Sequence, residues 1–384
     1  MGCENIATSQ TTLDIATIFQ KFYSYHAKNA TETKVANDIL NCRTEVLGGH
    51  LLQCDKCLAS HYVFNSCRNR HCPKCQFLKK TKWVEARISE ILPVQYFHVV
   101  FTIPSELKPL FLINKKICYN LLFNAVSETL KDVAKTRGIE LGFTSVLHTW
   151  GQKLLDHPHI HVVIPGGGFS LDGLTWIKCK NKYFFPVKIL SKVFRGKLLS
   201  FLEKEKNLIL PENSDIKFIL TASAKHDWVV YAKPPFAGPE SVINYLGQYT
   251  HKVAIANNRI KEISENTVTF SFKDRANNNE KDLLEIPGAE FIRRFLLHVL
   301  PNRFCRIRHH GFLARRSKNK KLQKARLLLD AKPIEIAKNE TWKELFKRII
   351  GIDIDQCANC KTGKMVSIKS IPINQKLIKR LDSS

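Results

Sequence analysis

The stretch that decides the fold is His157-Pro158-His159-Ile160-His161-Val162-Val163-Ile164-Pro165, followed by Gly166-Gly167-Gly168. Histidine recurs there at every second position of an apolar run, a pattern that predicts a β-strand with imidazoles on one face. The stretch from Phe143 to Trp150 is a second strand candidate, joined to the first by a short polar connection. Together they predict an antiparallel hairpin.

The histidine face of this strand is a candidate metal site. Alternate side chains lie roughly 6.6 Å apart, so His159 and His161 can reach one ion, whereas His157 lies roughly 13 Å from His161. We therefore expect the third ligand on the neighbouring strand, with candidates in the order His148, His157 and Gln152. Imidazoles that only hydrogen-bond within a sheet are the alternative. Two histidines with open positions suit Mg²⁺ or Mn²⁺ as a Lewis acid, although histidine also binds Ni²⁺ and Zn²⁺.

A pair of tyrosines, Tyr245 and Tyr249, stands at positions i and i+4 of the stretch 239–255, which we expect to be helical. That spacing puts both phenols on one face. Aromatic pairs at this spacing usually pack in a core, but the neighbouring Asn, Gln, Thr, His and Lys side chains make this helix polar. A phenol with a pKa of about 10 needs a positioned phosphate and a metal or base to act as a nucleophile.

Two Cys-x-x-Cys units, Cys54/Cys57 and Cys72/Cys75, lie in one short segment. Four cysteines form a closed, structural zinc site, so we expect these four to bind zinc; buried unliganded thiols are the alternative. Nearby residues that could replace or add a ligand are Cys67, His71 and His50. A third unit, Cys357-x-x-Cys360, has no second pair nearby and either takes distant ligands or consists of unliganded loop thiols.

The charge of the chain points to a polyanionic partner. Its 384 residues carry 60 Lys and Arg against 34 Asp and Glu, a net charge of +26. Nucleic acid is the expected partner, and a ribosome-associated or merely soluble basic protein is the alternative. Metal-type cysteine spacing and the lack of a basic-then-apolar leader favour a reducing cytoplasm. No apolar run approaches the roughly 20 residues of a membrane span, so we expect no membrane partner.

Clusters of cations predict where the polyanion binds. The chain becomes strongly basic beyond Pro301 and should follow the phosphate backbone there. The candidate DNA contacts are Arg68, Arg70, Lys74, Arg303, Arg306, Arg308, Arg315 and Arg316. Phe304 and Phe312 lie among them and could stack on bases, although packing in the core is their expected fate.

Hydrophobic periodicity indicates an α+β fold. Helices are expected at about 12–47, 77–92 and 109–135, and further strands at 96–103, 217–221, 228–232 and 267–272. The expected domains are an N-terminal helical segment (1–47), a zinc-binding domain (48–95), a core (96–315) and a basic C-terminal region with Cys-x-x-Cys (316–384).

These motifs resemble those of the HUH-type two-tyrosine transposases of the insertion sequence ninety-one family. The resemblance covers about residues 45–315 and rests on the stretches 66–76, 96–104, 146–152, 157–168, 186–195, 245–255 and 291–301. It implies a zinc-binding domain before an HUH endonuclease core, in which a central antiparallel sheet flanked by helices holds the histidine pair. Carried over, His159 and His161 are metal ligands, and Tyr245 and Tyr249 are nucleophiles.

The resemblance further implies a bacterial transposase that nicks and rejoins single-stranded DNA through 5′-phosphotyrosine intermediates, in rolling-circle transposition. The expected metals are structural Zn²⁺ and catalytic Mg²⁺ or Mn²⁺, and the expected partners are single-stranded element ends and target DNA. The sequence has no Walker loop, so we expect host replication proteins to unwind the duplex. The rival functions are a non-enzymatic zinc-dependent DNA-binding regulator and a metal-dependent nuclease that activates water.

Because Lys and Arg release counterions when they bind phosphates, we expect the affinity for single-stranded DNA to fall steeply with salt. For six phosphate contacts, the plot of log K against log salt concentration would have a slope of roughly −4. Fluorescence anisotropy of a labelled oligonucleotide over a series of NaCl concentrations measures this slope. A flat response would contradict electrostatic binding.

Overall fold

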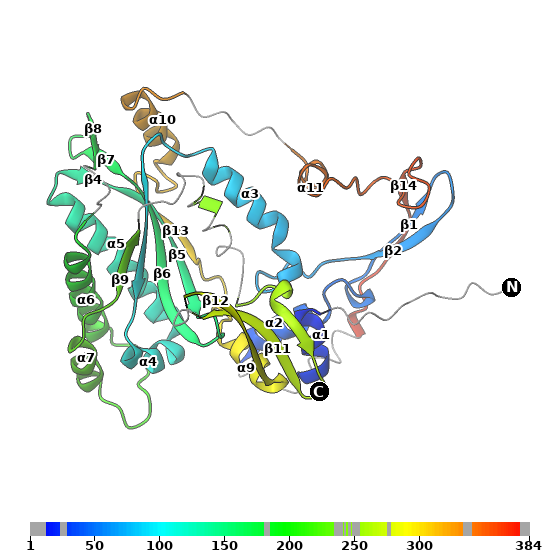
Figure 1. Cartoon of the computed structure of the whole chain (residues 1–384), viewed down its shortest axis with the longest axis horizontal. Coiled ribbons are helices and arrows are strands. Elements are labelled where there is room, and N and C mark those ends of the chain that lie inside the picture. The colour runs from blue at the N-terminus through cyan, green and yellow to red at the C-terminus, as the bar shows by residue number, and fades with distance from the viewer. Residues whose placement is uncertain are drawn as a thin grey trace.

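The centre of the computed structural model is a five-stranded antiparallel sheet (Figure 1). Its strand order is β13 (Ile307–Gly311), β5 (Gly142–Trp150), β6 (Asp156–Pro165), β3 (Tyr96–Thr102) and β9 (Val230–Lys233). The predicted hairpin is therefore confirmed as β5 and β6. The structure describes residues 13–23, 29–179, 185–233, 241, 243–244, 247, 254–274, 278–332 and 340–376.

The two faces of this sheet are covered differently. Ile160 and Val162 of β6 belong to a large apolar core with the helices α5 (Lys115–Lys135) and α6 (Val187–Lys204). The same layer contains η3 (Ser105–Leu107), α4 (Lys108–Ile113) and α7 (Ile216–Ala224). On the opposite face, Val163 packs with Val84 of α3 (Phe77–Ile88). Because side chains alternate along a strand, His159 and His161 lie on this second face. The expected α+β fold, with helices flanking an antiparallel sheet, is confirmed.

The N-terminal helices belong to a second apolar core. The helices α1 (Ile15–Phe22) and α2 (Ala30–Leu40) pack against α9 (Gly288–Leu297) and a sheet of β10 (Ile260–Ile263), β11 (Thr267–Asp274) and β12 (Glu280–Pro287). The rings of Phe19 and Phe295 meet edge to face, with centroids 5.4 Å apart. The short helix η4 (Asn257–Arg259) leads into β10. The N-terminal helices and the segment 254–299 thus build this core together.

A small sheet explains the glycine run that follows β6. It consists of β4 (Ile139–Glu140), β7 (Gly167–Ser170) and β8 (Trp176–Lys178). Gly167 has φ +154°, and a side chain at Gly168 would collide with the carbonyl of Glu140. Phe169 packs beneath α10 (Lys318–Leu328) with Phe312. The glycines therefore allow the strand to turn closely onto β4.

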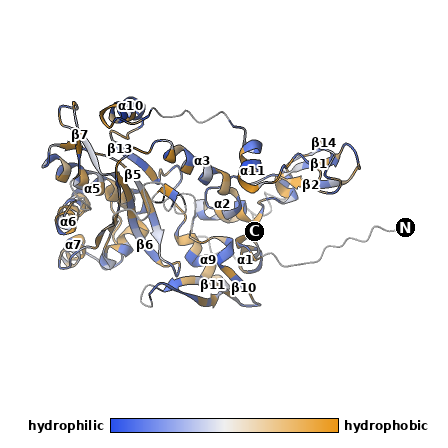
Figure 2. Ribbon diagram, turned by 45° about the horizontal axis from the view of Figure 1, so that its top comes forward, coloured by the Kyte–Doolittle hydropathy of each residue, from blue (hydrophilic) through white to orange (hydrophobic). Residues whose placement is uncertain are grey.

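A third small sheet lies at the end of the molecule away from α6 and α7 (Figures 1 and 2). Its strands are β14 (Met365–Ile371), β1 (Gly49–Cys54) and β2 (Ser60–Phe64), with β1 in the middle. The helix α11 (Trp342–Ile350) precedes β14, and the short helices η1 (Glu45–Leu47) and η2 (Pro73–Cys75) flank the hairpin. In the described part of the chain, no helix is both long and apolar enough to cross a membrane.

Two predicted elements differ from the structure. The strand expected at 217–221 is wrong, because this stretch lies in the helix α7, whose N-terminus is capped by the Asp215 carboxylate accepting from Lys217 N. Ile216, Ile219 and Leu220 give it an apolar side at helical spacing. The helix expected at 109–135 is interrupted at Asn114, where φ is −107° and ψ is 39°.

The domain boundaries expected from the sequence stay predictions, but the structure joins segments that they separate. Strand β14 of the expected C-terminal region pairs with β1 of the expected zinc-binding domain. Cys42, on the N-terminal side of the boundary at residue 48, lies 3.5 Å from the sulfur of Cys75. Both contacts link parts of the chain that the expected boundaries assign to different domains.

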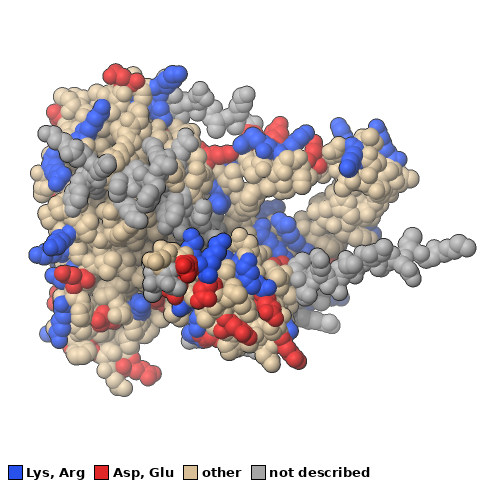
Figure 3. All heavy atoms as spheres, viewed as in Figure 1, with Lys and Arg blue, Asp and Glu red and all other residues tan. Residues whose placement is uncertain are grey.

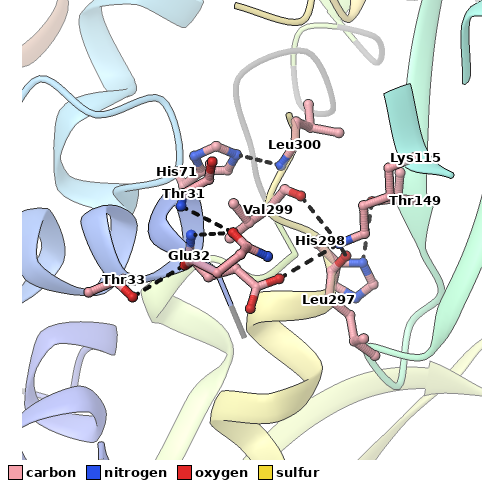
Figure 4. Close-up of polar contacts among 11 residues, drawn as sticks. Thr31, Glu32, Thr33, His71, Lys115, Thr149, Leu297, His298, Val299 and Leu300 are labelled. Atoms are coloured by element: carbon pink, nitrogen blue, oxygen red, sulfur yellow. Dashed lines mark hydrogen bonds and ion pairs between the residues drawn. The ribbon is translucent and has the colours of Figure 1, made fainter. Parts of the chain in front are cut away.

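Buried polar contacts tie the N-terminal helices and the cysteine segment to the central sheet (Figure 4). Lys115 Nζ, at the start of α5, donates to the carbonyl of Leu297 at 2.9 Å and lies 4.0 Å from the Glu32 carboxylate of α2. The Leu300 N–H donates to His71 Nε2 at 3.2 Å. Lys115 of α5 and His71 of the cysteine segment thus hold the chain at the end of α9 from two sides.

His298, in the same network, is a buried neutral imidazole (Figure 4). Its Nε2 lies 3.0 Å from the carbonyl of Leu154, so this nitrogen donates, and Nδ1 accepts from the Thr149 hydroxyl at 3.2 Å. Burial lowers the pKa of His298 to about 4.

The depressed pKa of His298 predicts a pH dependence of stability. Its contribution is present above the unfolded-state pKa of about 6.5 and is lost as the pH falls toward about 4. We expect His298→Gln to reduce the slope of the unfolding free energy against pH in that window. Urea unfolding at several pH values measures the slope, with substitution of the exposed His61 by Gln as the control. An unchanged slope in His298→Gln would contradict the assignment.

Candidate active site and metal centres

The three histidines His148, His159 and His161 form one cluster. Their ligand nitrogens all lie within 4.8 Å of one another, and the three side chains are buried. The register of the hairpin produces this cluster, because His148 of β5 pairs directly with His159 of β6. The structure therefore places His148, the first candidate for the third ligand, beside the histidine pair.

Hydrogen bonds orient the two histidines of β6. His159 Nδ1 lies 2.5 Å from the His157 carbonyl, which can only accept, so Nδ1 carries the proton. His161 Nδ1 lies 2.8 Å from Nε2 of His98 on β3, and the two rings are stacked with centroids 5.0 Å apart. Both Nε2 atoms therefore remain to face each other, 3.0 Å apart.

This arrangement fits a metal ion. Two imidazole nitrogens bound at about 2.1 Å with a right angle between them lie about 3 Å apart, as His159 Nε2 and His161 Nε2 do. Burial and the neighbouring His161 and His159 hold the pKa of His148 well below its ordinary value. A neutral imidazole keeps the lone pair that a metal ligand needs. The cluster is a candidate metal centre.

A cavity of about 570 Å³ opens beside the histidine cluster. Its walls come from β5, β6 and the sheet of β10 to β12, and both His157 and Gln152 line it. The charged groups at its wall are five cations against two carboxylates, namely Lys108, Lys153, Arg259, Lys273 and Lys281 with Asp156 and Asp274. Arg259 is held in place by hydrogen bonds to the carbonyls of Ser271 and Gln152, each at 2.7 Å. The positive excess suits a polyanionic ligand.

The cysteines form two clusters among the described residues. Cys72 and Cys75 lie with Cys42 and Cys67, with Sγ–Sγ distances of 3.5 Å from Cys42 to Cys75 and 3.6 Å from Cys67 to Cys75. Two sulfurs bound to a tetrahedral zinc at about 2.3 Å lie about 3.8 Å apart, so this geometry fits zinc. The additional ligand Cys67 was a candidate from the sequence, and Cys42 was missed.

The other predicted pair, Cys54 and Cys57, lies in the second cluster with Cys357 and Cys360. The prediction that Cys54, Cys57, Cys72 and Cys75 bind one ion is therefore wrong. Sequence proximity suggested that grouping, but the pairing of β14 with β1 brings the C-terminal cysteines to Cys54 and Cys57.

His71 and His50 lie outside both cysteine clusters. Burial lowers the pKa of His71 to about 3, and its Nε2 accepts from the Leu300 N–H. His50 Nδ1 lies 3.3 Å from the Ser367 hydroxyl on β14. The expectation of His71 as a zinc ligand is wrong, because its ring is engaged with the segment after α9.

The eight predicted DNA contacts divide into three groups. Arg306 is buried, so the prediction that it touches DNA is wrong. Arg70 donates to the carbonyls of residues 301 and 304, Lys74 pairs with Asp14 at 2.7 Å, and Arg308 stacks on Phe123. These three cations have structural partners. The exposed members, whose DNA contacts stay predictions, are Arg68, Arg303, Arg315 and Arg316. Phe304 and Phe312 are buried in cores, as expected.

Positive charge is also spread over the surface outside these residues. Figure 3 shows Lys and Arg across the whole width of the face in view, without a single dominant patch. The Lys and Arg residues on this face would add a long-range attraction for DNA.

The tyrosine pair, Tyr245 and Tyr249, lies outside the described residues. Ser241, Ile243, Asn244 and Gly247 of the same stretch are helical, which agrees with the helix expected there. Ile243 packs with Val163 on the histidine face of the sheet.

His98 is a site residue that sequence reasoning missed. The stretch 96–103 was identified as a strand, and His98 alternates within it between Phe97 and Val99, which lie in the large core. That alternation put His98 on the polar face. Only the pairing of His98 with Val163 in the register of β3 against β6 brings its ring to His161.

Two family models match most of the chain. Residues 14–103 match a model described as a transposase zinc-binding domain, and residues 142–321 match one described as "Putative transposase". The first match contains Cys42 and the cysteines from 54 to 75, and the second contains the histidine cluster.

Two relatives agree with these matches. The protein named "Putative transposase y4qJ" of Sinorhizobium fredii is 43% identical over 377 residues, which cover 93% of this chain and 95% of that protein. The transposase for insertion sequence element IS801 of Pseudomonas savastanoi pv. phaseolicola is 29% identical over 298 residues, or 74% of this chain and 71% of that protein. The chain therefore belongs to the insertion sequence ninety-one family of transposases and has an N-terminal zinc-binding domain.

Proposed function

We propose that this transposase nicks and rejoins single-stranded DNA through 5′-phosphotyrosine intermediates, in a rolling-circle route. The observation that carries the proposal is the cluster of His148, His159 and His161, which opens on a cation-lined cavity of about 570 Å³. A transposase acts on DNA, and this site combines metal-ligating imidazoles with positive charge suited to a phosphodiester.

His159 and His161, with His148 as the third ligand, would hold Mg²⁺ or Mn²⁺. When bound, such an ion would polarise the scissile phosphate as a Lewis acid. Lys153 and Lys281 would bind the neighbouring phosphates, because both are exposed at the cavity wall. His98 and the His157 carbonyl would keep the two ligating rings oriented.

The covalent step belongs to Tyr245 and Tyr249. One phenol oxygen attacks phosphorus, the bond between phosphorus and the 3′-oxygen breaks, and the proton lost by the phenol is balanced by the proton gained by the 3′-oxygen. A free 3′-hydroxyl that attacks the phosphotyrosine reverses the step and rejoins a strand. The ester conserves the bond energy, so no nucleotide cofactor is needed. Two tyrosines allow two covalent links at once.

The packing around the tyrosine stretch supports this assignment. Ile243, two residues before Tyr245, packs with Val163, which shares a strand face with His161. A side chain at Gly247 would collide with Val84 of α3, so the helix backbone approaches α3 closely there. The described residues on both sides of Tyr245 therefore contact Val163 and Val84, which pack together on the histidine face of the sheet.

We further propose that single-stranded element ends and target DNA are the substrates, that host replication proteins supply the unwinding, and that the reaction takes place in the cytoplasm. The two alternative functions would need only some of the residues proposed for the site, or none of them. A DNA-binding regulator needs neither histidines nor tyrosines, and a nuclease that activates water needs the histidines alone. A covalent protein–DNA adduct separates strand transfer from both.

We expect the protein to form a denaturation-resistant adduct with single-stranded DNA from its element's end in the presence of Mn²⁺. The double change Tyr245→Phe and Tyr249→Phe should abolish this adduct, because it removes both nucleophilic oxygens. Denaturing gel electrophoresis of end-labelled DNA measures it, and Tyr62→Phe, at an exposed tyrosine of β2, is the matched control. An adduct that survives the double change would refute these nucleophiles.

The role of His98 predicts a loss of metal affinity. His98→Phe keeps the stacked ring but removes the partner of His161 Nδ1, so we expect Mn²⁺ binding to weaken about 10–100-fold. His157→Ala keeps the carbonyl that orients His159 and should leave the affinity nearly unchanged. Isothermal titration of the metal-free histidine site measures both. An equal loss in His157→Ala would make His157 a ligand and contradict the cluster proposed here.

A further inference from the structure

Two pairs of cysteines from opposite ends of the chain meet at one point. Cys54 and Cys57 lie at the end of β1, Cys357 and Cys360 precede β14, and the four sulfurs lie within 4.8 Å of one another. We propose that these four cysteines bind one structural zinc ion, which fastens the C-terminal segment 340–376 to the hairpin of β1 and β2. This site goes beyond the strand-transfer chemistry, and the matched zinc-binding domain, residues 14–103, contains only half of it.

The sulfur positions fit one tetrahedral ion. The Sγ–Sγ distances are 3.6 Å from Cys54 to Cys360 and 3.6 Å from Cys57 to Cys357, close to the edge of about 3.8 Å expected around zinc. Each contact joins a cysteine of one pair to a cysteine of the other. The two pairs therefore form one ligand set and not two separate half-sites.

The two Cys-x-x-Cys loops have the same backbone shape. The residue after the second cysteine has positive φ in both, 61° at Leu58 and 57° at Lys361. In both, the N–H of that residue donates to the carbonyl of the first cysteine, at 3.2 Å for Cys54 and 2.9 Å for Cys357. Positive φ is uncommon outside glycine, so its recurrence at the same position indicates the same local constraint. Turning two thiolates toward one ion is such a constraint.

Backbone N–H groups point at two of the sulfurs. Lys56 N and Cys57 N lie 3.4 and 3.5 Å from Cys54 Sγ, and Gly363 N lies 3.2 Å from Cys360 Sγ. Such donors stabilise the negative charge of thiolates, the form that binds zinc. A side chain at Gly363 would collide with Cys54 Sγ, so a glycine there lets the two loops approach.

Few side chains of the C-terminal segment are buried. Among its described residues, 340–376, only Leu345, Cys357 and Gly363 are buried. The ion pair of Arg348 with Glu85 on α3, at 2.8 Å, joins exposed groups and contributes little in water. With so small an apolar core, the pairing of β14 with β1 needs a further source of stability, and zinc ligation supplies it in domains of this kind.

Zinc content of purified full-length variants tests the proposal. We expect Cys357→Ser with Cys360→Ser to lose one zinc per chain, because two of four ligands are gone, and Cys54→Ser with Cys57→Ser to lose the same one. Combining all four changes should lose no more, whereas adding Cys67→Ser with Cys72→Ser should remove a second ion. Inductively coupled plasma mass spectrometry measures the content, with Cys179→Ser and Cys305→Ser, outside both clusters, as the control. Unchanged zinc in the C-terminal pair variant, or two ions lost from the fourfold variant, would overturn the proposal.

Cysteine alkylation in the unaltered protein gives a second test that does not depend on the variants folding. Cys57 and Cys305 are both exposed. We expect zinc to protect Cys57 while Cys305 reacts, and a chelator to make Cys57, Cys357 and Cys360 reactive together, as followed by peptide mass spectrometry. Rapid labelling of Cys357 and Cys360 in the zinc-loaded protein, with Cys57 protected, would show that the two pairs do not share an ion.

Discussion

The register of β5 against β6 is the constraint on which the site depends. His148 stands opposite His159, and Leu147 stands opposite Ile160, so the three imidazoles share one face of the hairpin and these two aliphatic side chains share the other. A shift of one residue would exchange the faces, placing histidines in the core beneath α5 and aliphatic side chains at the cavity. Because the core buries Leu147 and Ile160 completely, it also determines where the histidines lie. The alternation of side chains along these two strands therefore determines both the core packing and the position of the histidines.

A strand and a separate module of helices and strands complete the histidine face of the sheet. On one side, β3 contributes His98, whose hydrogen bond to His161 selects the nitrogen that faces the cluster. On the other side, the module of α1, α2, α9 and β10 to β12 forms a wall of the cavity and carries much of its positive charge. This module is joined to the sheet by the Lys115, His71 and His298 contacts. The site thus depends on docking between two apolar cores.

At the hairpin of β1 and β2, a cluster of cysteines takes the place of a hydrophobic core. The hairpin of β1 and β2 exposes large side chains such as Tyr62 and Val63, so burial alone contributes little to holding it. Cross-linking by a metal stabilises such small units because ligation is coupled to folding. This hairpin and the sheet that carries the candidate active site are accordingly stabilised by different interactions.

The local sequence pattern determined much of the secondary structure of this protein. The hairpin, the strand at 96–103, the helical N-terminus and the α+β class follow from hydrophobic periodicity within single stretches. The sequence ranked His148 first among three candidates for the third position, because a hairpin with a short connection has few possible registers. The structure places His148 beside His159 and His161. Net charge indicates DNA as a partner, because it depends only on composition. Cysteine spacing indicates zinc, because it depends only on residues close together in the sequence.

Only the tertiary structure decided which distant residues meet. Cys42 joins Cys67, Cys72 and Cys75, and Cys357 and Cys360 join a pair about three hundred residues earlier, a partition that spacing could not distinguish from four neighbouring ligands. Arg306 belongs to a basic run by sequence yet is buried, and the stretch 217–221 is strand-like in composition yet helical. In each case the outcome depends on contacts between segments far apart in the chain, because burial and ligand geometry are properties of the folded whole and not of the local sequence.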